Sequence, residues 1–92
     1  MQPTVTLSVR FEKGTRFYHI SVQEDLFGDW VVVRVNGRIN SPMGQIHTLA
    51  FKSKAKADEF YQDECLRRKK RGYVEAKNFT NRVPLVKEGM AD

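Results

Sequence analysis

The spacing of the apolar residues changes once along this chain of 92 residues, near Ser53. Before that point, apolar and polar residues mostly alternate, which is typical of half-buried β-strands. After it, Ala57, Phe60, Tyr61 and Cys65 recur at spacings of three and four residues, which indicates the apolar face of a helix. A chain that changes from period two to period 3.6 is predicted to form an α+β fold.

Four strands are expected before Ser53. Trp30 to Val33 is apolar on both faces, so we expect this strand to lie centrally in the sheet. The predicted strands are Val5–Phe11, Arg16–Glu24, Trp30–Asn36 and Gln45–Phe51. We therefore expect an antiparallel sheet of four to five strands packed against one main helix. The side chains predicted to be largely buried are Tyr18, Ile20, Val22, Trp30, Phe60 and Tyr61.

The helix is bounded by residues that commonly begin and end helices. Ser53 is a suitable N-cap, and Gly72 is a suitable stop. The length fits a single domain over residues 1–92, with a core of about 5–80, a frayed N-terminus through Thr4 and a C-terminal tail that is loose after Lys87. Apolar residues are expected to pin the earlier part of the tail to the domain: Phe79, Val83, Leu85 and Val86.

The net charge of +5 is unevenly distributed. From Trp30 to Ala57 there are five basic residues and no acid, and from Arg67 to Asp92 there are eight basic residues and three acids. Such segregation indicates a positive surface, which favours an anionic partner such as nucleic acid. The longest apolar run is too short to cross a membrane, and the N-terminus lacks a signal-peptide pattern. We expect no membrane partner and a cytoplasmic location.

Catalytic and metal-binding residues are sparse. His19, His47 and the single Cys65 form a weak ligand set for zinc. Cys65 falls on the apolar face of the helix, so a buried, inert thiol is the better interpretation. The acids of the helix are interpreted as a solvated face. We expect no enzyme activity, no cofactor, no metal and no small-molecule substrate.

The strand that begins at Trp30 is predicted to end at Asn36-Gly37 and to lead into a loop that continues to Gln45. Trp30 itself is more typical of a core residue than of a base-stacking platform. In an extended chain, Arg34, Asn36 and Arg38 point the same way and form one polar row suited to phosphate recognition. Gly37 breaks that geometry or lets another backbone approach closely. The alternative is that both arginines pair with acids across the sheet.

A second basic stretch ends the helix, namely Arg67, Arg68, Lys69, Lys70 and Arg71. Five cations in a row followed by Tyr73 suit phosphate contacts plus stacking on a base. The alternative is a solvated helix end, where cations are favoured by the helix dipole.

Several short motifs occur in an order that resembles the WGR domain, which is named for a Trp-Gly-Arg tripeptide. They are Asp25 to Trp30, Val35 to Ile39, Gly44-Gln45, and Ala57 in a helix that closes with Lys70-Arg71-Gly72-Tyr73. The later stretch from Lys77 to Thr80 resembles the segment that follows the domain in poly(ADP-ribose) polymerases. The domain occurs in poly(ADP-ribose) polymerases and in small bacterial proteins. The Leu-Phe-Gly turn and the basic stretch before Gly72 resemble the bacterial members.

The resemblance implies an antiparallel sheet packed with a helix, and it implies DNA binding. In the polymerases the domain binds DNA at breaks, with its Trp stacked at a strand end. Here Gly37 and Arg38 match the tripeptide, and Asn36 stands at the Trp position. Asn lacks the apolar face that stacking needs, whereas phosphate binding through Arg38 is retained. We therefore expect a non-catalytic module that binds nucleic acid, DNA first, through phosphates. The alternative is a protein-interaction module whose basic face docks an acidic partner.

Overall fold

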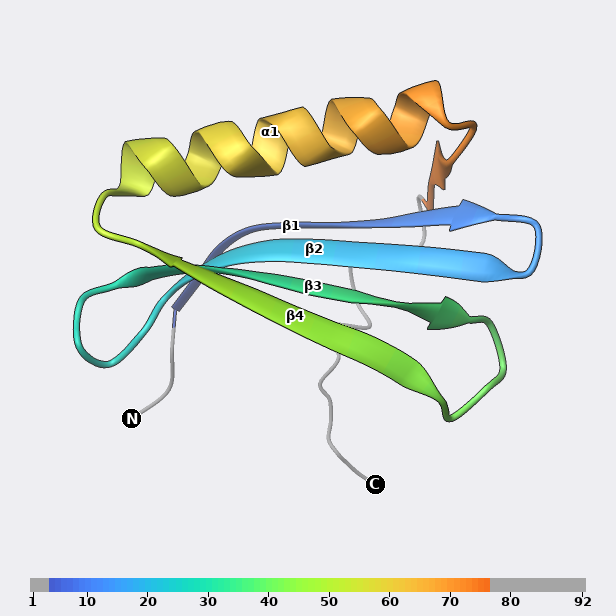
Figure 1. The fold of residues 1–92 in the computed structure, drawn as a ribbon, viewed down its shortest axis with the longest axis horizontal. Coiled ribbons are helices and arrows are strands. Elements are labelled where there is room, and N and C mark those ends of the chain that lie inside the picture. Colours follow the sequence, from blue (N-terminus) through green and yellow to red (C-terminus); the bar gives the residue numbers. More distant parts are fainter. Residues whose placement is uncertain (1–3, 77–92) are drawn as a thin grey trace.

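The computed structural model describes residues 4–76, which form one five-stranded antiparallel sheet and one helix (Figure 1). The α+β prediction is confirmed. The strand order is β4-β3-β2-β1-β5, and α1 lies across one face of the sheet. The elements are β1 (Thr4–Lys13), β2 (Arg16–Glu24), β3 (Trp30–Arg38), β4 (Gly44–Phe51), α1 (Lys54–Lys70) and β5 (Val74–Glu75).

Two expectations about the chain ends are affected by this range. Thr4 was expected to fray, but it begins β1 and pairs with Glu24, because the β1–β2 ladder extends to that residue. The remaining expectations concern residues outside the described range, namely the fraying of residues 1–3, the loose end of the tail, and the apolar anchors Phe79, Val83, Leu85 and Val86. Within residues 4–76, no helix is long and apolar enough to span a membrane.

The core lies between α1 and the central strands. Ile20, Val22, Val32 and Ala57 are completely buried there. This follows from the strand period of two, which points alternate side chains of β2 and β3 toward the helix. Tyr18 and Tyr61 are also buried, as predicted.

Trp30 and Phe60 are only half-buried, contrary to the prediction. Trp30 is the first residue of β3 and pairs with Phe51 of the edge strand β4. Phe60 packs its ring 5.7 Å from that of Phe51. Beyond β4 there is no further strand among the described residues, so both rings pack against the core on one side only.

Both predicted helix boundaries are confirmed. The Ser53 hydroxyl accepts a hydrogen bond from the Lys56 backbone N–H at 3.2 Å, which satisfies one free donor of the first turn. At the other end Gly72 has a φ of +92°, and its N–H donates to the Lys69 carbonyl at 3.0 Å. This left-handed residue reverses the chain, which then places Tyr73 and β5 beside β1.

The predicted break at Asn36-Gly37 is wrong. β3 continues to Arg38, and Gly37 pairs with Phe17 on one side and with Gly44 on the other. A Cβ atom at Gly37 would lie 2.9 Å from the Met43 carbonyl oxygen. Glycine therefore serves here for close backbone approach, which was the second expectation for this position, and the loop is confined to residues 39–43.

Candidate nucleic-acid interface

Three segments that are distant in sequence meet at one end of the molecule. They are the turn between β1 and β2, the loop 39–43, and the end of α1 with Tyr73 (Figure 1). The Ile39 N–H donates to the Thr15 carbonyl at 2.7 Å, which joins the loop to the turn. The Lys13 Nζ donates to the Arg71 carbonyl at 2.6 Å, which joins the turn to the helix end. The antiparallel connections bring these segments together, and the hydrogen bonds fix them there.

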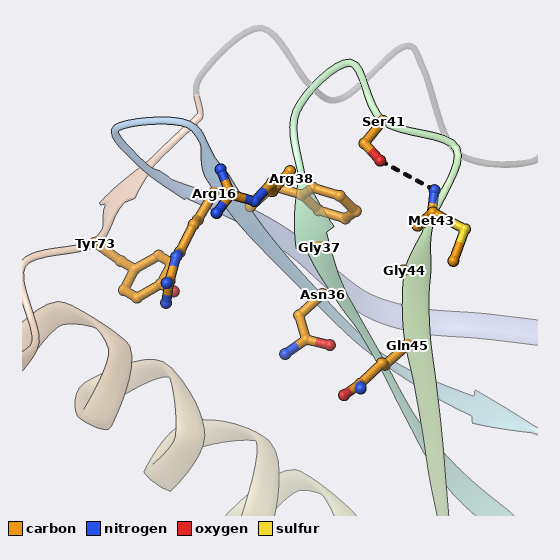
Figure 2. Close-up of a pocket in the computed structure, with 10 residues that line it drawn as sticks. Arg16, Asn36, Gly37, Arg38, Ser41, Met43, Gly44, Gln45 and Tyr73 are labelled. Atoms are coloured by element: carbon orange, nitrogen blue, oxygen red, sulfur yellow. Dashed lines mark hydrogen bonds between the residues drawn. The ribbon is translucent and has the colours of Figure 1, made fainter.

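A pocket of about 450 Å³ opens between these segments, and we call it the rim pocket (Figure 2). In Figure 2, Asn36 and Gln45 point toward the helix side of the sheet, in keeping with their cross-strand pairing. Arg38 is exposed to solvent. The residues that line the rim pocket are Arg16, Phe17, Asn36, Gly37, Arg38, Ser41, Met43, Gly44, Gln45 and Tyr73.

Two further pockets adjoin the rim pocket. The turn pocket, about 510 Å³, is lined by Lys13, Gly14, Thr15, Arg16, Arg68, Arg71 and Tyr73. The inner pocket, about 250 Å³, is lined by Tyr18, Arg34, Asn36, His47 and Arg68. Shared residues connect the three: Arg16 and Tyr73 line both rim and turn pockets, Asn36 rim and inner pockets, and Arg68 turn and inner pockets.

The charge of this surface is entirely positive. Six cations line the three pockets, and neither an Asp nor a Glu does. The six are Lys13, Arg16, Arg34, Arg38, Arg68 and Arg71. We call this surface, together with Tyr73, the basic end. A surface that concentrates cations without carboxylates attracts an anionic partner.

A family model of the WGR domain matches residues 2–80 of the chain. The chain belongs to the WGR family. WGR domains are in general modules of the nucleic-acid-binding type. No curated protein and no solved structure gave a significant match.

The segment Asn36-Gly37-Arg38, which resembles the WGR tripeptide, lines the rim pocket of the basic end. Arg34, Asn36 and Arg38 form a continuous row, because Asn36 lines both the inner pocket with Arg34 and the rim pocket with Arg38. The alternative of cross-sheet ion pairs has no support within residues 4–76. The cross-strand neighbours of Arg34 are Ile20 and His47, and that of Arg38 is Arg16.

The basic stretch at the end of α1 is divided between two surfaces. Arg68 and Arg71 line the basic end, as does Tyr73. Arg67 and Lys70 instead line a separate pocket of about 320 Å³ with Asp63 and Leu66. Lys69 lines none of these pockets. Successive residues of a helix point about 100° apart, so five consecutive cations cannot share one face.

One acid of the helix is buried, contrary to the expected solvated face. Glu64 is 5% exposed, and its Oε1 accepts a hydrogen bond from the Tyr18 hydroxyl at 3.0 Å. Burial, followed by the neighbouring Glu64, raises the pKa of Tyr18 to about 12. Glu64 occupies a position on the apolar face of α1, where it lies behind the inner pocket and not in its lining. Glu64 was expected to be exposed because its side chain is charged. The hydrogen bond from the Tyr18 hydroxyl explains its burial.

The remaining reactive side chains are separated. His19 is buried on the sheet face away from α1, whereas His47 is exposed on the helix face beside Arg34. Cys65 is buried, as predicted, and burial raises the pKa of its thiol. Within the described residues, no three His, Cys, Asp or Glu side chains are grouped as metal ligands would be.

Two residues of the basic end were not selected from the sequence. Lys13 and Arg16 flank the turn at Gly14. They join the site because Arg16 pairs across the sheet with Arg38, and because the Lys13 side chain reaches the helix end. The sequence does show a cation on each side of a predicted hairpin turn. It does not show that these cations lie near Arg38, because that depends on the order of the strands in the sheet.

Proposed function

We propose that the basic end binds nucleic acid, DNA in the first place, through phosphate contacts and without catalysing a reaction. The observation that carries this proposal is the set of three connected pockets lined by six cations and no carboxylate. The family membership supports it independently. The proposal assigns the first role to Arg38, because its exposed side chain continues the polar row of β3.

The side chains suit a phosphate backbone. Arginine presents a planar fork of donors that matches two phosphate oxygens. Tyr73 offers an aromatic ring among the cations, with the Lys13 Nζ 5.9 Å and the Arg68 Cζ 5.6 Å from its centroid. An aromatic ring within a basic surface is suited to stacking on a base. Asn36 stands where the WGR tripeptide has its Trp, so an amide takes the place of a large aromatic ring. Phosphate contacts therefore contribute more to binding than stacking does.

The direct test is a salt series on duplex DNA. Each neutralised phosphate releases about 0.9 of a counterion, so three to five contacts give a log–log slope of roughly −3 to −4.5. The affinity expected at physiological salt is about micromolar, the tight end of non-specific binding. Arg38→Ala should weaken binding to all duplexes similarly and reduce the slope by about one.

Lys52→Ala provides the matched control. Lys52 is an exposed cation that follows β4, at the end of the sheet opposite the rim pocket. The Lys52→Ala variant loses the same unit of charge as Arg38→Ala, but at a place away from the basic end. The slope of its salt series should therefore stay near that of the wild type. Absence of binding by the wild-type protein at low salt would rule out the nucleic-acid proposal. Equal slope changes in Arg38→Ala and Lys52→Ala would show that net charge, and not the basic end, governs binding.

A protein partner is the second candidate, and the edge strand β4 favours it, because no strand among residues 4–76 pairs with its outer side. β4 is an edge strand of eight residues without an Asp, Glu, Lys or Arg, and Ile46 within it is 68% exposed. An uncharged, exposed edge can pair with an extended segment of another chain. This candidate predicts one specific protein partner, which is acidic where it also docks on the basic end, whereas the first candidate predicts binding to many duplexes. The cytoplasmic location and the absence of catalysis stay predictions.

A further inference from the structure

The inner pocket differs from the rest of the basic end because it lies between the helix and the sheet. Tyr18 and Asn36 are cross-strand neighbours on β2 and β3, and Arg34 and His47 are cross-strand neighbours on β3 and β4. Arg68 comes from α1 above them. Four elements thus converge on a cavity of about 250 Å³.

The guanidinium groups that line this pocket have unused hydrogen-bonding capacity. The Nε of Arg34 and the Nε of Arg68 are inaccessible to water, and neither has a hydrogen-bond partner among residues 4–76. The same holds for the Oδ1 of Asn36. A side-chain amide that turns about its last bond presents an NH₂ donor in place of the oxygen. Buried polar groups are normally paired, so three unpaired ones on residues that line a single pocket favour a polar ligand there.

The protein does not neutralise the charge of this pocket. Glu64 is the carboxylate nearest to Arg68, but its Oε1 lies 3.8 Å from the Arg68 Nη2 and already accepts the Tyr18 hydroxyl. The other oxygen of Glu64 lies 3.8 Å from Arg67. One carboxylate is therefore shared among three donors, while Arg34 forms no ion pair within the described residues. Charges held in a partly dry environment without a counterion are costly, and an anion would relieve that cost.

Aromatic rings hold both guanidinium groups in position. The Arg68 Cζ lies 4.1 Å from the centroid of the Tyr18 ring, and the Arg34 Cζ lies 5.5 Å from that of Phe60. Donors that are already positioned lose little conformational entropy when they bind a ligand. Two such arginines beside a histidine suit an anion with several oxygens and more than one negative charge.

We propose that the inner pocket is a binding site for a single phosphate group, held by Arg34 and Arg68 with His47 and Asn36 at its sides. This role is separate from duplex binding along the basic end, because it requires a small anion to enter between α1 and the sheet. The phosphate group comes either from a free anion, such as inorganic phosphate or a nucleoside monophosphate, or from the phosphorylated end of a nucleic-acid strand.

The test is a titration with inorganic phosphate in low-salt buffer, followed by backbone amide NMR. Binding should saturate and shift the signals of residues around Arg34, His47 and Arg68. Arg34→Gln and Arg68→Gln should each weaken phosphate binding by about tenfold or more, as expected for a lost charged hydrogen bond. Lys56→Gln, an exposed cation at the start of α1, is the matched control and should leave the affinity unchanged.

Thermal unfolding gives a second measurement. Phosphate should raise the melting temperature of the wild type but not that of Arg34→Gln, because only a folded pocket binds the anion. Competition with phosphate by adenosine monophosphate and by a phosphorylated oligonucleotide, each against its dephosphorylated form, identifies the source of the group. Shifts that never saturate, or equal weakening by Lys56→Gln, would overturn the proposal. DNA binding is measured in parallel, so a protein that binds duplex without binding phosphate would refute this site alone.

Discussion

The interface between α1 and the sheet has two dissimilar parts. The apolar part lies between strands β2, β3 and β4 and the first half of the helix, and it is made by Ile20, Val22, Val32, Phe51, Ala57 and Phe60. The polar part is made by residues nearer the helix end: Tyr18, Arg34, Asn36, His47, Glu64 and Arg68. The same two elements thus exclude water at one end and enclose a charged pocket at the other.

This difference shows how a small domain can combine a stable fold with a binding site. Burial of apolar side chains in the apolar part stabilises the fold, so the polar part can keep charges that contribute little to folding. The attraction between buried charged groups is largely offset by the cost of removing them from water, so such groups are weak evidence for a stable fold. The two parts should therefore respond differently to substitution. Changes in the apolar part should cause the largest losses of stability, whereas changes to the arginines that line the inner pocket should alter ligand binding more strongly than stability.

The largest effect on stability is expected in the apolar part. Ile20→Ala removes a completely buried side chain beneath α1 and leaves a cavity. The free energy of unfolding should fall by about 2–5 kcal/mol, which chemical denaturation would measure. Leu66→Ala, on the helix but 57% exposed, should change it by less than about 0.5 kcal/mol. Similar losses in the two variants would contradict the division of the interface.

A second prediction concerns the pH dependence of stability, and it rests on a residue outside both parts of the interface. His19 is on the opposite sheet face, where burial and then the nearby Arg10 lower its pKa from 6.5 to about 4. The unfolded chain binds a proton more readily, so stability is full above pH 6.5 and decreases as the pH falls toward 4. The loss should reach about 3 kcal/mol at the low end.

Two variants show whether His19 is responsible. His19→Gln should flatten the pH dependence of the free energy of unfolding over this range, whatever its effect at neutral pH. His47→Gln changes the exposed histidine of the polar part and should leave the pH dependence as it is. If His47→Gln flattened it instead, His19 would not be the source of the pH dependence.

The apolar part was largely predictable from the sequence, and the polar part was not. The period of the strands selected Tyr18, Ile20 and Val22, and the period of the helix selected Ala57 and Tyr61. These assignments depend only on local repetition. Trp30 and Phe60 were overestimated, because burial at a sheet edge depends on which strand lies outermost.

The polar part and the rim pocket depend on the register between strands. Arg16 reaches the site only because it pairs with Arg38, and Glu64 is buried only because Tyr18 lies opposite it. The extension of β3 through Gly37 was missed because Asn-Gly is a common turn signal. The close approach of Met43 and Gly44 explains the glycine here, and a single sequence does not reveal that contact.

Tyr18→Phe tests the side-chain hydrogen bond between the Tyr18 hydroxyl and the Glu64 carboxylate in the polar part. It removes the donor to the buried Glu64 carboxylate, which then keeps only Arg67 and Arg68 at 3.8 Å. The free energy of unfolding should decrease by about 1.5–3 kcal/mol, the range for a hydrogen bond to a charged group. Tyr61→Phe, at the other buried tyrosine, removes a hydroxyl whose hydrogen-bond partner is the Cys65 thiol and not a carboxylate, so it should cost less. A larger loss in Tyr61→Phe would reverse the assignment of the charged hydrogen bond.

The smallest expected effect is a gain in DNA affinity from a substitution at Asn36, the residue that lines both the rim pocket and the inner pocket. Asn36→Trp places an aromatic face in the rim pocket, next to Arg38 and Tyr73. Stacking on a base is worth about 1–3 kcal/mol, so affinity should increase for duplexes with free ends or nicks. Closed circular DNA offers no unstacked end, and its affinity should stay nearly unchanged. The measurement is a salt series on both kinds of DNA with the wild type and the variant, in which equal gains on both would show that this part of the basic end does not lie at a strand end.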